Sequence, residues 1–507
     1  MQKSYFEFMK EISSEELYCG LLAHGLFSEK LPPVFTSENF YDYCETKQPS
    51  FKDKRRQYIF YENMRNINTP RPLGIPSPMA YQHLCRCLAD NWGKLCEHFN
   101  DMTAEQSHKV SRIHIRKLSG NSALFEMNYK NWKADGSPEP DLLIGKRWIV
   151  KADISNCFPS IYTHSLPWAL VGKKDAKDHK DNKKEWFNKI DHFSQNIKNG
   201  ETHGLLIGPH TSNLLSEIIL TSIDNELTKI GWKYIRNIDD YTCYVSDYED
   251  GQRFLADLNR WLRYFDLALN HKKTEIVKLA ITADKSWVRQ IGSMQILPKS
   301  EILNYKEVRA YLDHAIELAH CNDSDASILN YALKVLSSRS VTENAKAYIV
   351  KTILHWAVLY PYLIPLLNEY VFEKFSINKD DIIKFTNDIF AYGIKRRNYE
   401  AASYALFFAI KYEFKIEDIS IEDIIESDNT VLMLLAYKYF ELSSDPISLK
   451  LKEVAEKLEK DKDIDRHWLF VYEALPESKL QEEWKAMKKA GVSFLKSFKT
   501  DAAIKAK

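Results

Sequence analysis

The most informative segment of the chain reads Tyr234-Ile-Arg-Asn-Ile-Asp-Asp-Tyr-Thr-Cys-Tyr-Val245. Two runs of apolar, β-prone residues flank the adjacent acids Asp239 and Asp240, which predicts a tight hairpin with both acids at its tip. Two neighbouring ionised carboxylates repel each other, and a divalent cation compensates that repulsion; Mg²⁺ favours one or two carboxylates plus substrate phosphates. An isolated Asp-Asp pair is also typical of a solvent-facing turn, so the hairpin needs a partner before it indicates a metal site.

That partner is the segment Trp148-Ile-Val-Lys-Ala-Asp-Ile-Ser-Asn-Cys-Phe-Pro-Ser-Ile-Tyr162. An apolar strand runs into Asp153 and leaves through a turn at Asn156 to Pro159. Asp153 would hold metal, and Phe158, five positions later, would lie under a nucleotide sugar. Alone, a strand-end Asp fits a helix cap equally well. Together, the two segments predict three carboxylates around two metal ions about 4 Å apart, the arrangement used for in-line phosphoryl transfer.

These segments resemble the motifs of reverse transcriptases. Asp153–Phe158 resembles motif A, Gly204–Ile218 motif B, Arg236–Tyr241 motif C and Leu269–Ile276 motif D, in the order that the family has them. The continuation Ile161–Leu170 is similar to the bacterial defence-associated reverse transcriptases, including the abortive-infection type. The resemblance covers roughly the first three fifths of the chain well, and the remainder more loosely.

The resemblance implies an α+β fold, with right-hand polymerase fingers and palm in residues 1–300. The fingers would span about 50–145 and the palm, an antiparallel sheet with helices, about 146–300. An all-α, helical-repeat-like domain would follow in 301–507. There, helical spacing of apolar residues predicts amphipathic helices. They are expected near 308–319, 328–336, 345–360, 380–395, 399–412, 429–442 and 449–458.

The resemblance also implies a set of site residues. Asp153, Asp239, Asp240 and Lys273 would be catalytic, and Asp153, Ile154, Asp239 and Asp240 would bind two Mg²⁺ ions, or Mn²⁺ in their place. Lys273 would act as a general acid or a point charge on phosphate, the alternative being a surface lysine beside a strand. Phe158 would exclude a 2′-hydroxyl and so favour deoxynucleotides. Gly208 and Pro209 would form the turn that supports template and nucleotide.

The alternating segment Ser111–Lys117, a turn and a returning strand from Leu124 predict a second hairpin. Its basic residues Arg112, Arg116 and Lys117 are expected to bind the triphosphate, because guanidinium groups bind phosphate in a bidentate manner. An exposed strand whose cations prevent edge aggregation is the open alternative.

Two departures from the family's motifs stand out. Asn237 replaces the usual aromatic two places before the first motif C acid, which bears on stacking at the primer end. Ile207-Gly208-Pro209 replaces the usual Pro-Gln-Gly of motif B, which bears on the template grip. Neither departure removes a metal ligand.

The composition of the chain limits its number of domains and the way in which it can bind nucleic acid. The 507 residues predict two or three domains, and 70 basic residues cancel 70 acidic ones, so nucleic acid must bind in a local groove. A basic run from Lys52 to Arg71, interleaved with aromatic residues, predicts either a single-strand track or a solvated face. The Lys-rich segment from Asp175 to Asn199 is expected to be a solvated helix or loop, and the alternative is a role along the template duplex. Eight scattered cysteines and no signal-peptide or membrane-spanning pattern indicate a cytoplasmic protein that binds no membrane.

The function that follows is an RNA-directed or untemplated DNA polymerase in antiphage defence. The resemblance implies dNTPs, RNA or single-stranded DNA, and a companion non-coding RNA as partners, protein or RNA priming, and a homo-oligomer, a trimer or hexamer. The alternative is a catalytically silent nucleic-acid-binding sensor or scaffold in phage defence.

Overall fold

The computed structural model describes residues 5–65, 70–112, 114–116, 125–126, 138–280, 286–293, 302–322, 325–460 and 464–498. The N-terminal part consists of short helices around one long hairpin. Its elements are α1 (Tyr5–Lys10), α2 (Ser14–Leu22), α3 (Glu38–Lys47), β1 (Tyr58–Met64), β2 (Pro70–Pro76), α4 (Pro78–Asp90) and α5 (Trp92–Thr103). β1 and β2 pair antiparallel. α4 and α5 are separate helices, because the chain leaves helical geometry at Asn91, where φ is −107° and ψ is 15°.

A four-stranded antiparallel sheet forms the centre of the molecule. Its strands are β5 (Trp148–Asp153), β6 (Tyr234–Asn237), β7 (Asp240–Val245) and β8 (Glu275–Lys278), in the order β6-β7-β5-β8. Apolar residues alternate along β7, so Tyr241, Cys243 and Val245 are buried. The predicted motif C hairpin and antiparallel sheet are both present.

Two long helices pack with this sheet. α12 (His210–Lys229) is buried along most of its length, and α13 (Tyr248–Tyr264) packs on β5 and β7. α13 begins at Tyr248 because the Asp247 side chain accepts from Asp250 N–H and caps the helix. It ends at Tyr264, and Asp266, with φ of +64°, turns the chain back toward β5.

Several short elements connect the strands. β3 (His114–Ile115) and β4 (Phe125–Glu126) form a small antiparallel pair within the second predicted hairpin. α7 (Glu139–Leu143) precedes β5. α8 (Cys157–Ser160), α9 (Ser165–Val171), α10 (Lys173–Asp178) and α11 (Trp186–Asn196) lie between β5 and α12 in the chain.

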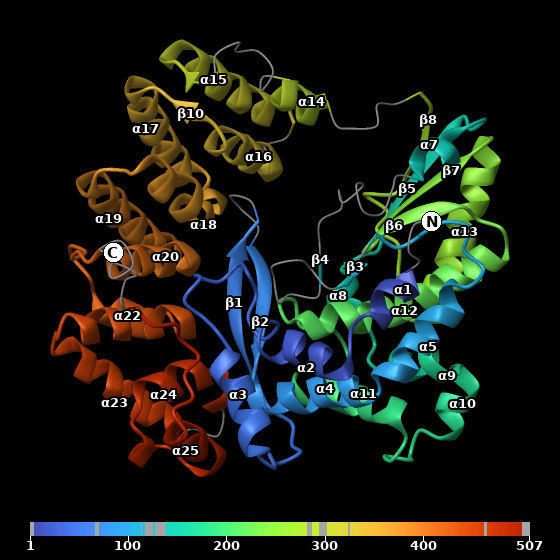
Figure 1. Cartoon of the computed structure of the whole chain (residues 1–507), viewed down its shortest axis with the longest axis horizontal. Helices are drawn as coiled ribbons and strands as arrows, with labels where there is room; N and C mark the ends of the chain where they lie inside the picture. Colours follow the sequence, from blue (N-terminus) through green and yellow to red (C-terminus); the bar gives the residue numbers. More distant parts are fainter. Residues whose placement is uncertain are drawn as a thin grey trace.

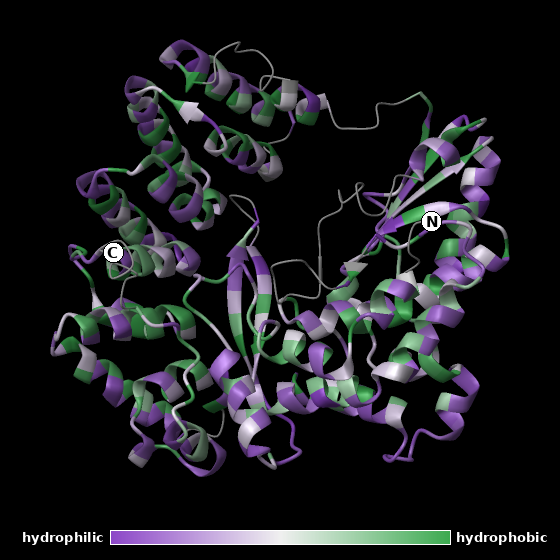
Figure 2. Cartoon of the chain, in the orientation of Figure 1, coloured by the Kyte–Doolittle hydropathy of each residue, from purple (hydrophilic) through white to green (hydrophobic). Residues whose placement is uncertain are grey.

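The C-terminal part is helical apart from a parallel two-residue pair, β9 (Ile302–Leu303) with β10 (Ser340–Val341). Its helices are α14 (Ser286–Ser293), α15 (Tyr305–Cys321), α16 (Ala326–Ser337), α17 (Glu343–Leu359), α18 (Ile364–Leu367), α19 (Lys379–Arg396), α20 (Tyr399–Tyr412), α21 (Ile421–Glu426), α22 (Thr430–Leu442), α23 (Ile447–Glu459), α24 (Trp468–Ala474) and α25 (Glu482–Lys489). Short 3₁₀ and π turns lie at Pro361–Leu363, Asn368–Glu373, Ile464–Arg466 and Glu477–Lys479. Most helices carry both hydrophilic and hydrophobic residues, as Figure 2 shows.

The C-terminal helices pack against the N-terminal hairpin, which stands between them and the central sheet in Figure 1. Arg56 is buried and forms ion pairs with Asp465, at 3.4 Å, and with Glu483. Lys52 pairs with Glu482 at 2.7 Å. The basic run that the sequence offered as a nucleic-acid track is therefore partly neutralised by C-terminal acids. Among the described helices, none combines the length and apolar character needed to cross a bilayer.

Candidate active site

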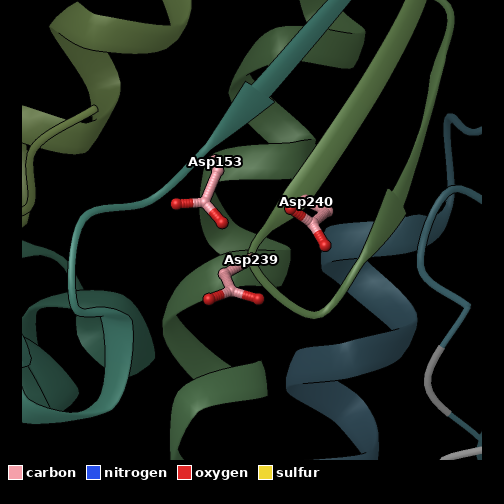
Figure 3. Close-up of side chains that lie close together, drawn as sticks. All are labelled: Asp153, Asp239 and Asp240. Carbon is pink, nitrogen blue, oxygen red and sulfur yellow. The ribbon is translucent and has the colours of Figure 1, made fainter. Parts of the chain in front are cut away.

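Three carboxylates converge where β5 ends beside the β6–β7 turn. The register places Asp153 directly opposite Asp240 across β5 and β7, and Asp239 lies in the turn itself. One oxygen of each carboxylate lies within 4.8 Å of the others, and Figure 3 shows the three side chains gathered at one point. Asp153 is buried, Asp239 is half-buried and Asp240 is exposed, so the cluster opens toward solvent on one side.

The turn between β6 and β7 consists of Ile238 and Asp239. Ile238 has φ of +55°, a left-handed conformation that a β-branched residue rarely adopts and that costs on the order of 1–3 kcal/mol. The surrounding structure holds it there, since its side chain is buried. The backbone N–H of Ile154 donates to the carbonyl of Asp239 at 3.1 Å and so ties the end of β5 to this turn. Ile154 thus lies beside the carboxylates, as its predicted ligand role requires.

The buried guanidinium group of Arg236 stabilises the β6–β7 hairpin. Arg236 on β6 has no exposed surface, and it donates to Asp224 at 2.6–3.1 Å and to both carboxylate oxygens of Glu217 at 3.0 Å. Its Nη1 also donates to the carbonyl of Ile238 at 2.9 Å. Glu217 and Asp224 lie on α12, so this network connects the motif B helix to the strained turn. Sequence reasoning did not single out these residues, although an Arg within an apolar strand is a usable signal.

The electrostatics of the cluster favour a bound cation. Burial raises the pKa of Asp239, with repulsion from Asp153 adding to it. Partial loss of surrounding water, then repulsion from Asp239 and contact with Asp153, raises the pKa of Asp240 to about 6. Carboxylates with raised pKa values are compensated by a nearby positive charge, and all-oxygen donors suit a hard divalent cation. The residues present therefore fit a divalent metal site.

Lys273 and Asn270 both contact Asp153. Lys273 Nζ lies 2.8 Å from Oδ2 of Asp153, and Asn270 Nδ2 donates to Oδ1 at 2.9 Å. The backbone N–H of Asn270 also donates to the carbonyl of Asp153, at 2.8 Å. The sequence predicted Lys273 but not Asn270, which belongs to the same motif D segment. An Asn three positions before a lysine does not by itself indicate a site residue, because only the fold brings Asn270 to Asp153.

The motif B turn lies against the hairpin formed by β1 and β2. Gly208 has φ of +129°, and a Cβ there would approach the carbonyl oxygen of Gly74 to 3.3 Å. The backbone N–H of Gly74 donates to the carbonyl of Ile207 at 2.9 Å, and Pro209 is the N-cap of α12. Only a residue without a side chain allows both approaches easily. Phe158 is half-buried, and its carbonyl accepts from the N–H of Leu205 at 2.8 Å, so motifs A and B meet at this point.

The predicted triphosphate-binding residues of the second hairpin are placed less favourably. Arg112 and Arg116 are 5% and 6% exposed, and the Arg116 guanidinium lies 5.5 Å from the centre of the Phe8 ring. Lys117 lies outside the described residues. Buried guanidinium groups favour packing over phosphate contact, although the nucleotide-binding role of these three residues stays a prediction.

Arg71 on β2 is a cation that the sequence placed in the basic run but not in the site. Its charge acts on the carboxyl of Asp239, where it lowers a pKa that burial raises. Arg71 is exposed at the start of the strand that the motif B turn contacts. The charge of Arg71 therefore reaches one of the three acids, as that of Lys273 does.

A strand with one acid, opposed in register to a hairpin with two, brings together three carboxylates, the type of ligand set that can hold the divalent metals of phosphoryl transfer. Residues 71–309 match the family described as "Reverse transcriptase (RNA-dependent DNA polymerase)". Residues 71–309 are therefore similar to a reverse transcriptase domain, a class of domain that generally uses divalent metals, and the chain is an enzyme of the nucleotidyltransferase type.

A search of curated proteins finds no match. One solved structure that matches is described as "Structure of apo telomerase from Candida Tropicalis". It has a TM-score of 0.34 and 12% sequence identity, and the match covers 82% of this chain and 73% of that one. A structural similarity this low supports no conclusion about the function of this chain.

Proposed function

We propose that this protein is a DNA polymerase that adds deoxynucleotides by a two-metal mechanism with Mg²⁺. The observation that carries the proposal is the convergence of Asp153, Asp239 and Asp240, with an oxygen of each within 4.8 Å of the others. When bound, the two ions would lower the pKa of the attacking hydroxyl and neutralise charge on the leaving pyrophosphate.

The chain's own residues would position the substrate around these ions. Asp153, Asp239, Asp240 and the carbonyl of Ile154 would hold the metals. Lys273, which already lies against Asp153, would provide a mobile positive charge for the pyrophosphate. Phe158 would lie under the sugar and disfavour a 2′-hydroxyl.

The fingers would hold the triphosphate and the template. Arg71 is our preferred residue for the triphosphate, because its charge reaches Asp239 while Arg112 and Arg116 are buried. Gly208 and Pro209 would support the template base through the turn that meets Gly74.

We assign residues 1–300 to fingers and palm and 301–507 to a helical domain that takes the place of a polymerase thumb. The contacts of Arg56 with Asp465 and Glu483 support a helical domain that is docked on the fingers. A docked domain of this size is suited to hold a companion RNA, a nascent product or a second subunit of a trimer or hexamer.

The proposed biological role is antiphage defence in the cytoplasm, and its support is the resemblance of Ile161–Leu170 to the defence-associated enzymes. Synthesis would be templated by RNA or untemplated, and would start from a protein hydroxyl or an RNA end. The alternative, a silent nucleic-acid sensor, would keep the acids without turnover.

The deciding experiment is to purify the protein with the nucleic acid that accompanies it, supply each dNTP separately with Mg²⁺, and sequence the product. One nucleotide sufficing indicates homopolymer synthesis, and a need for all four indicates templated copying. No incorporation under either condition, by protein that remains folded, would favour the sensor and contradict the polymerase.

A further inference from the structure

A second pocket, which none of the three carboxylates lines, lies among α9, α10 and α11. α9 and α10 are at the lower right of Figure 1. Its volume is about 800 Å³, and neither the carboxylates nor Lys273 or Phe158 line it. This volume falls within the range of pockets that enclose ligands of nucleotide size, roughly 300–1,000 Å³. The polymerase proposal gives this pocket no role.

The wall of the pocket contains an oriented histidine. His164 Nδ1 lies 2.5 Å from Oδ2 of Asp191, and Gln195 Nε2 donates to Oδ1 of the same carboxylate at 2.7 Å. Asp191 is 7% exposed, whereas the His164 side chain is 42% exposed. The hydrogen bond to Asp191 raises the pKa of His164, which favours the imidazolium. A buried carboxylate therefore holds a solvent-facing imidazole in one orientation, with Nε2 left as its other polar atom.

A second lining acid is also hydrogen-bonded within the protein. His192 Nε2 lies 3.0 and 3.1 Å from the two oxygens of Asp53, and Asn196 Nδ2 donates to Asp53 at 2.7 Å. Two of the three lining acids, Asp53 and Asp191, are therefore engaged by histidine and amide groups, and Asp181 is the third.

Four lysines line the same pocket: Lys177, Lys180, Lys183 and Lys189. All four are exposed, and in the part of the chain that the structure describes none of their ammonium groups forms an ion pair. Four lysines against three lining carboxylates, two of which are hydrogen-bonded to other side chains, give the pocket a net positive charge in a molecule whose formal net charge is zero. Such a local field attracts a phosphorylated ligand.

Aromatic rings complete the pocket. Tyr162 and Trp168 are half-buried and meet edge to face, with ring centres 5.7 Å apart. His164 meets Tyr162 at 4.8 Å with the rings at 90°. A ring system beside cations is the arrangement that holds a nucleotide, because the base stacks while the phosphate is neutralised.

We infer that this pocket is a binding site for a nucleotide unit outside the catalytic cleft. Lys177, Lys180 and Lys183 with His164 contact the phosphate, and Trp168 and Tyr162 contact the base. A bare inorganic anion would leave most of the volume empty. The ligand is therefore a free nucleotide or one end of a single strand, which share this chemistry.

The test measures binding of a fluorescent, 5′-phosphorylated trinucleotide in EDTA, in an Asp239→Asn plus Asp240→Asn background. The chelator and the substitutions remove the metal site, so failure of this inference and failure of the polymerase proposal remain distinguishable. The variant is Lys177→Glu, Lys180→Glu and Lys183→Glu together. The matched control reverses three exposed lysines on or next to α23: Lys450, Lys457 and Lys460.

We expect the pocket variant to lose at least about tenfold in affinity and to show a shallower salt dependence, by roughly one unit of slope for each lost phosphate contact. The control should bind as the parent does. Adenosine monophosphate binding as tightly as the trinucleotide identifies a free nucleotide, and weaker binding identifies a strand end. Equal affinity of the pocket variant and the control would overturn the inference.

A second measurement locates the ligand. A trinucleotide containing 5-iodouracil, irradiated on the same protein, should cross-link to Trp168 or Tyr162, and the cross-link should disappear with Trp168→Leu. His164→Ala should weaken binding of the 5′-phosphorylated trinucleotide more than binding of its 5′-hydroxyl counterpart. If His164 only connected α9 to α11 through Asp191, its loss would weaken binding of both trinucleotides equally. Cross-links confined to peptides outside 162–195 would contradict the assignment.

Discussion

The ammonium group of Lys273 lies 2.8 Å from Oδ2 of Asp153. The same carboxylate that is proposed to hold metal is therefore paired with a side chain proposed to act on pyrophosphate. Contact with Asp153 also raises the pKa of Lys273, so the lysine stays charged. A metal bound through Oδ2 of Asp153 would replace this ion pair and leave the lysine available to the substrate.

Lys273→Ala should separate metal binding from turnover. Without its competing cation, Asp153 should bind divalent metal several-fold more tightly. Incorporation should fall by about 10²-fold or more, the usual range for losing a proton donor or a charge at the leaving group. Metal-induced rises in Tm and single-turnover incorporation measure the two effects. Lys272→Ala, an exposed neighbour in the same loop, is the control. Identical behaviour of the two variants would contradict the role given to Lys273.

Metal affinity should depend on pH, because the pKa of Asp240 is raised to about 6. Below pH 6 a proton competes with the metal, so affinity should drop by up to about tenfold per pH unit, and it should be nearly flat above pH 7. The metal-free protein should lose stability as pH rises from about 4 to 6, since the folded-state pKa exceeds the unfolded one.

Metal titrations followed by Tm at pH 5, 6, 7 and 8 measure this dependence. Asp240→Asn should remove the contribution of this carboxyl, so the variant should gain stability relative to wild type as pH rises from 4 to 6 in EDTA. An affinity that is constant from pH 5 to 8 would show that Asp240 is ionised throughout.

Arg236→Met should be strongly destabilising. It leaves Glu217 and Asp224 buried without their cation, which typically costs about 3–5 kcal/mol. Urea unfolding measures the loss. Arg253→Met, which breaks an exposed pair with Asp250, should cost no more than about 1 kcal/mol.

Arg236→Met should also weaken metal binding, because the carbonyl of Ile238 loses its hydrogen-bond donor and the β6–β7 turn is no longer held in place. A variant as stable as Arg253→Met, with an unchanged metal-induced rise in Tm, would argue against the supporting role of Arg236.

Glu400→Gln should change the pH dependence of stability. Glu400 on α20 accepts hydrogen bonds from Asn63 Nδ2 at 2.6 Å and from the N–H of Met64 at 2.7 Å. These bonds connect the C-terminal helices to the hairpin of β1 and β2. Burial raises the pKa of Glu400 to about 7. The folded-state pKa exceeds the unfolded value, so stability should fall as pH rises from about 4.5 to 7, by up to about 1.4 kcal/mol per pH unit, and then level off.

Thermal unfolding between pH 4.5 and 8 tests this expectation. The variant should match the wild type at pH 4.5 and gain relative to it up to pH 7, while the exposed Glu417→Gln control should follow the wild type. Parallel curves for all three proteins would show that Glu400 does not titrate in this range.

The sequence predicted the elements that rest on local patterns. Alternation and the paired acids gave the β6–β7 hairpin, and helical spacing gave α20 with the same bounds, Tyr399–Tyr412. The single acid of β5 was connected to the hairpin through the resemblance, and the register then places Asp153 opposite Asp240.

What the sequence missed depends on distant partners. Asn270, Glu217 and Asp224 acquire their roles only because β5, α12 and β6 meet in space. Glu400 contacts residues more than 330 positions away. Arg112 and Arg116 looked exposed by alternation, but the segment packs beside β6 and α1 and buries them. No local pattern encodes such contacts.

The central claim is that Asp153, Asp239 and Asp240 form one metal-dependent centre for nucleotidyl transfer. The most direct test is incorporation of labelled dNTPs by wild type and by Asp239→Asn plus Asp240→Asn, with Mg²⁺ and with EDTA, after circular dichroism shows both proteins to be folded. Wild type should form product only with the metal, and the double variant should be reduced by at least about 10³-fold. Product formed at the wild-type rate by the double variant, or in EDTA, would contradict the claim.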